Sequence, residues 1–240
     1  MMVKNNHFLG FVSLGLLAAL VYISSCAPVA NPDHLKDHDG FAIDVLATET
    51  DSAFEAMEDL DRSDRENWQK PQMVISRLGD ISDKVVADIG AGTGYFSMPL
   101  ARNAKKVIAI DIEQQFLDYI NRQVSRTHDR KSLNIETRLT VASDPSLDSA
   151  EVDMVLIVNT YPFISNRVAY FKKVCRGLKP DGRLVVINFK NEPLPVGPPT
   201  EEKVGAEQVT LELDSAGFKT VNVDNESLDY QFTLTAEKRN

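Results

Sequence analysis

The chain has 240 residues, of which 43% are hydrophobic and 25% charged. These fractions are those of a folded protein and exclude a wholly disordered chain, and the length suits one large domain. The formal net charge is -9, whereas a protein that binds nucleic acid needs a surface of clustered basic residues. We therefore expect no nucleic-acid partner. Two cysteines, Cys26 and Cys175, are too few for a disulfide framework. No spacing of metal ligands is seen either, so we expect no metal site.

The first 26 residues have the pattern of an export signal. Lys4 precedes an uncharged, mostly apolar run from Phe8 to Ile23, which is short for a membrane span and typical of a signal-peptide core. The sequence Ile23-Ser-Ser-Cys26 then resembles the lipobox of bacterial lipoproteins. The resemblance implies a signal peptide at residues 1–25 and a membrane anchor through lipidated Cys26. An uncleaved signal anchor is the alternative.

Residues 26–50 follow the signal and contain Pro28 and Pro32 without hydrophobic periodicity, so we expect a tether. Lys4 lies before the apolar run and several aspartates lie after it, which predicts export of everything beyond the run. Ala27 stands directly after the cysteine, where an aspartate would signal inner-membrane retention. We therefore expect a lipoprotein on the periplasmic face, with the outer membrane favoured.

From residue 51 to residue 240 the pattern predicts a single α/β domain. Short apolar runs alternate with helical segments, which favours a mostly parallel sheet with helices on both faces. A closing pair of strands favours an antiparallel hairpin at one edge. In chain order, a helix is expected from Pro71 to about Gly79, and further helices at 94–103, 113–127, 167–177 and 201–216. The expected strands are 85–89, 106–111, 135–141, 154–159, 183–188, 219–224 and 229–235.

The most informative stretch is Val85-Val-Ala-Asp-Ile-Gly-Ala-Gly-Thr-Gly-Tyr-Phe-Ser. A β-rich run ends in Asp88, and a glycine-rich turn then leads into a helix. Glycines let the backbone turn sharply, and a ligand can approach the backbone N–H groups without a Cβ in the way. The dinucleotide-binding pattern G-x-G-x-x-G does not fit, because its third glycine would have to be Tyr95.

The pattern acid-x-Gly-x-Gly-x-Gly instead resembles motif I of class I S-adenosylmethionine-dependent methyltransferases. The resemblance implies that the loop holds the methionine part of the cofactor and that Asp88 supports its amino group. Asp111, at the end of the next strand, would accept the ribose hydroxyls, with Ile112 beside the adenine. Ser143 or Asp144 would reach the adenine amino group. The cofactor-binding residues so implied are Asp88, Gly90, Ala91, Gly92, Gly94, Tyr95, Asp111, Ile112, Ser143, Asp144 and Asn159.

The resemblance continues through Val152-Asp-Met-Val-Leu-Ile-Val-Asn-Thr-Tyr, Leu178-Lys-Pro-Asp-Gly and Ser215-Ala-Gly-Phe, and it covers about residues 62–240. It implies a Rossmann-like class I methyltransferase fold, a seven-stranded, mostly parallel sheet with an antiparallel C-terminal strand. Asn159 and Tyr161 follow the fourth strand and would orient the methyl acceptor, as the catalytic residues. Two residues upstream stay open. Trp68 is either a hydrophobic plug or part of a lid, and Arg65 pairs either a substrate anion or a neighbouring acid.

The implied function is transfer of a methyl group from S-adenosylmethionine to an unidentified small-molecule acceptor. Export conflicts with this function, because the cofactor is made in the cytoplasm. The leader could be a cytoplasm-facing anchor, or the cofactor could be supplied outside. The alternative is an exported lipoprotein that keeps the fold as a non-catalytic ligand-binding module, since a fold alone does not define a function. The sequence leaves the acceptor atom and the oligomeric state open.

Overall fold

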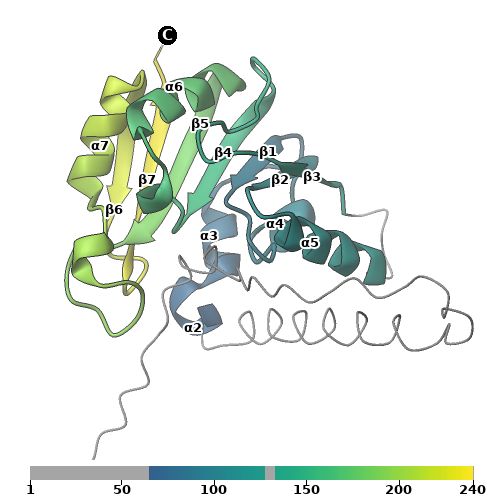
Figure 1. The fold of residues 1–240 in the computed structure, drawn as a ribbon, viewed down its shortest axis with the longest axis horizontal. Helices are drawn as coiled ribbons and strands as arrows, with labels where there is room; N and C mark the ends of the chain where they lie inside the picture. The colour runs from purple at the N-terminus through teal and green to yellow at the C-terminus, as the bar shows by residue number, and fades with distance from the viewer. Residues whose placement is uncertain (1–64, 128–132, 240) are drawn as a thin grey trace, which may run out of the picture. The chain divides into compact units, whose positions relative to one another are not determined.

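The computed structural model describes residues 65–127 and 133–239. The predicted signal peptide, the tether, Cys26 and the stretch 51–64 of the predicted domain lie outside the described residues. Figure 1 shows the described part as a twisted sheet with helices packed on both faces, so the predicted α/β class is confirmed. Among the described helices, none combines the length and the apolar character that crossing a membrane requires.

The sheet has seven strands in the order β3-β2-β1-β4-β5-β7-β6. Neighbours from β3 to β5 are parallel, whereas β7 pairs antiparallel with both β5 and β6. The predicted closing hairpin is therefore confirmed, and β7 is inserted between β5 and β6. The strands are β1 (Val85–Ile89), β2 (Lys106–Asp111), β3 (Ile135–Leu139), β4 (Val152–Val158), β5 (Leu178–Phe189), β6 (Phe218–Asp224) and β7 (Gln231–Lys238).

The helices of the described chain vary from short turns to more than three turns. Lys70 separates the first two of them, with a φ of 46°. The residue before a proline is disfavoured in the α-helical region, so the helix breaks there and restarts at Pro71. The helices are α2 (Arg65–Gln69), α3 (Pro71–Arg77), α4 (Ser97–Ala101), α5 (Gln114–Arg126), α6 (Arg167–Gly177) and α7 (Ala206–Ser215), with 3-10 turns η1 (Tyr161–Phe163) and η2 (Thr200–Glu202).

Several predicted boundaries shift for local reasons. β3 ends at Leu139, because Val141 turns back to form an isolated bridge with Asp144. β5 begins at Leu178, earlier than predicted, because an additional pair with Val152 precedes a register shift. α4 is shorter than predicted, since residues 94–96 belong to the turn after β1. The strands β1 and β2 have the predicted bounds.

Each face of the sheet buries its own set of apolar side chains, because neighbouring residues of a strand point to opposite faces. On one face, Val86 packs with Leu78 of the α3 region and Leu100 of α4. On the other face, Ala87 belongs to the core that contains Phe171 of α6 and Leu213 of α7. This two-sided core leaves the carboxyl ends of the parallel strands as the edge at which loops gather.

Candidate cofactor and acceptor site

The turn after β1 contains Gly90, Gly92 and Gly94, all with positive φ. A Cβ at Gly90 would overlap the Thr160 side chain, and one at Gly94 would lie 2.8 Å from Ile120 Cγ1. At Gly92, by contrast, no described residue other than Gly92 itself and its two chain neighbours lies within 4 Å of the position of a Cβ. Two of the glycines therefore allow close packing, whereas Gly92 leaves open space of the kind a ligand needs.

Asp111 ends β2 directly beside this turn. Its side chain is 8% exposed. Oδ2 accepts a hydrogen bond from the backbone N of Gly92 at 2.8 Å, and Oδ1 accepts one from the N of Glu113 at 3.0 Å. The structure thus brings the predicted ribose-binding carboxylate together with the open glycine, although they are 19 residues apart in the chain.

Three exposed apolar side chains surround the end of β2. Ile112, Leu139 and Val141 are 52%, 51% and 63% exposed. Leu139 is the register partner of Asp111 on β3, and the N of Thr140 donates to the Asp111 carbonyl oxygen at 2.9 Å. Exposed apolar groups that gather in one place mark a surface that contacts a ligand or partner. The sequence singled out Ile112 of these three.

Asp88 lies near the end of β1 and is almost fully buried. Its Oδ2 accepts a hydrogen bond from the Ser97 hydroxyl of α4 at 2.6 Å. Burial raises the pKa of the carboxyl to about 6, the charge of Asp111 adds to this rise, and Ser97 and Arg65 oppose it. Two acids so placed favour a ligand that carries positive charge.

Arg65 of α2 extends over the glycine turn. Its guanidinium lies 4.1 Å from the centre of the Tyr95 ring, and its Nε donates to Oε1 of Gln69. Further along α2, Trp68 packs against Phe189 at the end of β5, with ring centres 5.6 Å apart and ring planes tilted by 36°. α2 therefore reaches from the end of β1 to the end of β5. The charge of Arg65 acts on Asp88 from this position, and Trp68 lies against the end of β5.

Asn159 follows β4 directly and has a φ of 57°, a conformation that asparagine adopts more readily than most residues. Its backbone N donates to the Ile187 carbonyl oxygen at 2.9 Å. Its side-chain Oδ1 accepts a hydrogen bond from Nε2 of Gln231 at 2.7 Å. Asn159 therefore lies where β4, β5 and β7 meet, at the same edge of the sheet as the glycine turn.

Tyr161 was predicted to orient the acceptor, and its geometry argues against that role. The side chain is fully buried, its ring stacks on Phe171 of α6, and its hydroxyl donates to Oε2 of Glu212 on α7 at 2.7 Å. Burial raises the pKa of the hydroxyl, and the Glu212 carboxylate adds to the rise. Tyr161 thus attaches η1 to α6 and α7 through Phe171 and Glu212.

Asp144 is likewise directed away from the predicted cofactor contact. Its Oδ2 pairs with Lys173 Nζ of α6 at 2.9 Å, and its Oδ1 accepts the backbone N of Ser146 at 2.8 Å. Lys173 also donates to the Ser143 carbonyl oxygen. Hydrogen bonds to Lys173 and Ser146 hold the pKa of Asp144 below its usual value. The structure therefore unites Asp88, Asp111 and the glycines, but it joins residues 143–144 to α6.

Five residues of the site were not predicted from the sequence: Ser97, Gln69, Gln231, Leu139 and Val141, the last of which is at least as exposed as Leu139 and Ile112. Ser97 was inside the glycine motif and was not singled out, although a hydroxyl one helical position after the turn is a signal that could have found it. Gln69, Gln231 and Leu139 carried no local signal, because their importance depends on contacts between distant parts of the chain.

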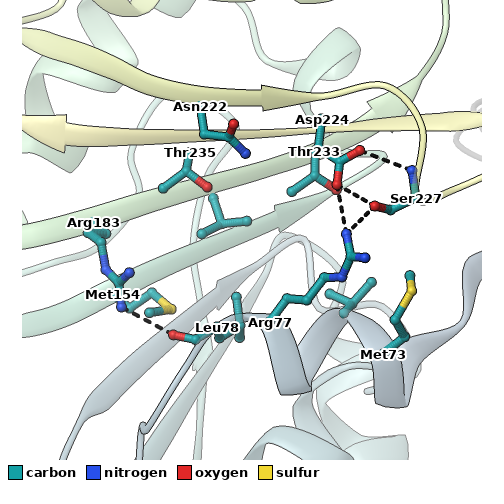
Figure 2. A pocket seen from close by; sticks show the side chains of 12 residues that line it. Met73, Arg77, Leu78, Met154, Arg183, Asn222, Asp224, Ser227, Thr233 and Thr235 are labelled. Carbon is teal, nitrogen blue, oxygen red and sulfur yellow. Dashed lines mark hydrogen bonds and ion pairs between the residues drawn. The ribbon is translucent and has the colours of Figure 1, made fainter.

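A separate cavity lies between α3 and the strands β4 to β7 (Figure 2). Its volume is about 120 Å³, and its lining includes Arg77, Arg183 and Asp224. Arg77 Nη1 pairs with Asp224 Oδ2 at 2.7 Å, and Arg183 Nη2 donates to the Leu78 carbonyl oxygen at 3.1 Å. A second hollow of about 380 Å³ lies beside Lys190 and the start of α7. Neither contains a residue of the glycine turn, and the contacts in Figure 2 fasten α3 to the sheet.

Within residues 65–127 and 133–239, no group of three or more His, Cys, Asp or Glu side chains is arranged to hold a metal ion. The acids of the site, Asp88 and Asp111, accept hydrogen bonds from backbone and side-chain donors. The chemistry that the arrangement supports is the binding of a ligand with hydroxyl groups, an apolar ring and a positive charge.

Comparison with known proteins agrees with this description. Residues 87–186 match the family model of a methyltransferase domain. Over 125 residues the chain is 35% identical to a demethylmenaquinone methyltransferase of Tropheryma whipplei (strain Twist), covering 52% of this chain and 49% of that protein. Over 174 residues it is 24% identical to an uncharacterized methyltransferase of Bacillus subtilis (strain 168), covering 71% and 91%.

Among solved structures, a SAM dependent methyltransferase from Aquifex aeolicus superposes with a TM-score of 0.69 at 26% identity, covering 77% of this chain and 98% of that one. The described part of the chain thus has the Rossmann-like class I methyltransferase fold, and residues 87–186 of it match a methyltransferase domain. The chain spans about half the length of the first curated relative that it matches.

Proposed function

We propose that the protein transfers a methyl group from S-adenosylmethionine to a small-molecule acceptor. The observation that carries this proposal is the pairing of a nearly buried carboxylate, Asp111, with the open side of Gly92. A carboxylate at the end of the second strand accepts ribose hydroxyls in nucleotide-binding folds of this kind. The methyltransferase domain match supports the same choice of ligand.

The residues of the site fit each part of this cofactor. Asp111 would accept the ribose hydroxyls, and the exposed side chains of Ile112, Leu139 and Val141 would contact the adenine ring. The space at Gly92 would hold the methionine part without a steric conflict. Asp88 would face its positive charge, and a cation beside Asp88 would lower the carboxyl pKa that burial raises.

S-adenosylmethionine, when bound, supplies a methyl group activated by a positively charged sulfur. The chain would contribute alignment, since holding two reactants in contact lowers the barrier without a dedicated acid or base. Asn159 lies at the end of β4 beside the glycine turn and would face the acceptor. α2 covers this edge through Arg65 and Trp68 and would limit the access of water.

The acceptor is proposed to be a small molecule, in keeping with the acidic net charge of the chain. One similar protein is named a demethylmenaquinone methyltransferase. That name supports a ring-bearing acceptor for this chain as well.

Calorimetric titration of the full-length chain with S-adenosylmethionine and S-adenosylhomocysteine tests the proposal. We expect saturable binding with one site per chain. Asp111→Asn should weaken it by about tenfold or more, since a carboxylate bond to a hydroxyl contributes roughly 1.5–3 kcal/mol. Asp118→Asn, an exposed change on α5, is the matched control and should bind as the parent does. A folded parent chain that binds neither compound would exclude the enzyme and favour the non-catalytic binding module.

We also propose that Cys26 is lipidated and that the domain is exported. The signal-like run from Phe8 to Ile23 and the lipobox-like Ile23-Ser-Ser-Cys26 support this. Metabolic labelling with a radioactive fatty acid should label the parent chain and not Cys26→Ser. Protease treatment of intact cells with a permeabilised outer membrane should degrade the exported domain. An unlabelled, protected chain would contradict both parts, and it would remove the conflict with a cytoplasmic cofactor.

A further inference from the structure

We infer that Gln69 and Gln231 recognise the methyl acceptor, and that this acceptor is an uncharged molecule with an O–H or N–H group. The inference rests on the proposed methyltransferase function. Both glutamine side chains are fully buried. In each, one amide atom is hydrogen-bonded within the chain and the other has no hydrogen-bond partner.

The hydrogen bond that each glutamine side chain makes determines which of its amide atoms is left without a partner. Oε1 of Gln69 accepts a hydrogen bond from Arg65, so the amide group is oriented and Nε2 is left as a donor. Nε2 of Gln231 donates to Asn159, so Oε1 is left as an acceptor. Buried polar atoms in folded proteins almost always have partners, and an orphaned one is costly. One free donor and one free acceptor therefore indicate a missing ligand.

The two amides lie in the same corner of the molecule. Trp68, the residue before Gln69, packs against Phe189 at the end of β5. Phe189 is the direct register partner of Gln231 on β7. Gln231 in turn bonds to Asn159, which follows β4. The contacts thus run from α2 to the strand ends where an acceptor would meet the cofactor site.

The charged groups around this corner are largely paired. Lys70 Nζ pairs with Asp229 Oδ2 at 3.1 Å, and Arg65 exerts its charge on Asp88. Lys190 Nζ donates to the Asp229 carbonyl oxygen at 2.9 Å, and it pairs with no carboxylate of residues 65–127 and 133–239. Lys190 is therefore the group that an anionic acceptor would use, and it provides the competing outcome of the test.

The chemistry of the two free atoms restricts the acceptor. A hydroxyl group can accept a hydrogen bond, as Gln69 Nε2 offers, and can donate one, as Gln231 Oε1 requires. A carboxylate has no hydrogen to donate to Gln231, and an ammonium has no lone pair for Gln69. The aromatic pair of Trp68 and Phe189 offers a wall for an apolar body. An uncharged, hydroxylated ring compound fulfils all of these conditions.

The test measures binding of catechol and of benzoate to the full-length chain saturated with S-adenosylhomocysteine, by saturation-transfer NMR. We expect catechol to bind and benzoate to bind about tenfold more weakly or not at all. Gln69→Met and Gln231→Met should each weaken catechol by about tenfold, while the affinity for S-adenosylhomocysteine stays within about twofold. Gln231→Glu keeps an acceptor oxygen at that position and should retain catechol.

Asn188→Leu is the matched control for folding. Asn188 is as buried as the two glutamines, but its Nδ2 is satisfied by the Val204 carbonyl oxygen at 3.1 Å. We expect Asn188→Leu to lower the melting temperature more than either methionine variant, because those remove an unpaired atom together with a paired one. A larger loss in the methionine variants would show that the amides act within the chain, which would overturn the inference.

The other outcomes are equally distinct. A parent chain that holds S-adenosylhomocysteine but not catechol, or variants that bind catechol as the parent does, overturns the inference and leaves the proposed function intact. Benzoate binding that is lost in Lys190→Met overturns it in favour of an anionic acceptor. A folded parent chain that does not bind S-adenosylhomocysteine removes the proposed function and this inference together.

Discussion

The two halves of the sheet edge satisfy their polar groups in different ways. On the side of β1 and β2, Asp88 bonds to Ser97, and Asp111 bonds to Gly92 and Glu113. On the side of β4, β5 and β7, buried amide atoms of Gln69 and Gln231 lack partners. In the first half both carboxylates accept hydrogen bonds from within the chain, so a ligand there adds to bonds that already exist. The second half is incomplete, so a ligand there contributes hydrogen bonds that the folded chain lacks.

The largest expected effect separates the roles of two neighbouring glycines on the first side. Gly90→Ala should lower the free energy of unfolding by about 2–5 kcal/mol, because a Cβ there overlaps Thr160 and the φ of 75° is strained for alanine. Gly92→Ala should cost only about 1–2 kcal/mol, from strain alone, since nothing lies within 4 Å. Denaturant unfolding of both variants measures the difference.

Titration with S-adenosylhomocysteine completes this comparison. Gly92→Ala should lose affinity although it is the more stable variant, because its new methyl group occupies the proposed ligand space. Equal stability of the two variants would contradict the packing role of Gly90, and unchanged affinity in Gly92→Ala would contradict the ligand role of Gly92.

The next effect concerns the pH dependence that Asp88 imposes. Its pKa is about 6 in the folded chain and near 3.8 when unfolded. Between these values the folded state binds more protons, so stability falls as the pH rises from about 4 to about 6 and stays lower above that. Asp88→Asn should abolish this fall and exceed the parent's stability at pH 8 by an amount on the order of 3 kcal/mol.

Urea unfolding of parent and Asp88→Asn from pH 4 to pH 8 measures this difference. Cofactor binding at pH 8 is the second measurement. Asp88→Asn should bind the cofactor more weakly than the parent does, because the carboxylate is gone. Asp118→Asn, on the exposed surface of α5, serves again as the control and should show no change in the pH profile. A parallel decline of parent and Asp88→Asn with pH would exclude Asp88 as the source.

A smaller effect is expected at Tyr161. It distinguishes a role in the site at the sheet edge from a role in packing against α6 and α7. Tyr161→Phe removes the hydroxyl that donates to Glu212 and should lower the free energy of unfolding by about 1–2 kcal/mol. Glu212 keeps its pair with Arg167 at 2.6 Å, which limits the loss. Binding of S-adenosylhomocysteine should not change. Strongly reduced methyl transfer at unchanged stability would restore the catalytic role that the sequence suggested.

The smallest effect is expected at the cavity of Figure 2. Arg77→Met breaks the pair with Asp224, in which the Arg77 side chain is about half exposed. Exposed ion pairs contribute roughly 0–1 kcal/mol, so the unfolding free energy should change by no more than that. Lys84→Met, which loses an exposed pair with Asp83, is the control. A clearly larger loss for Arg77→Met would show that α3 depends on this contact for its position.

The sequence determined most of the helices and strands and carried the prediction of the cofactor residues, because those signals are local. A glycine turn between a β-rich run and a helix, and an acid at the end of the next strand, are readable from short stretches of chain. The bounds of β1, β2 and α6 and the presence of the closing hairpin followed from the same periodicity and turn residues.

Only the tertiary structure bears on the proposed acceptor side. Whether Tyr161 faces a ligand or the core depends on Glu212 and Phe171, which the chain brings up from elsewhere. Gln69 and Gln231 look like ordinary polar residues until packing removes them from water and leaves one atom of each without a partner. Burial and hydrogen-bond satisfaction are properties of neighbours in space, so no local pattern carries them.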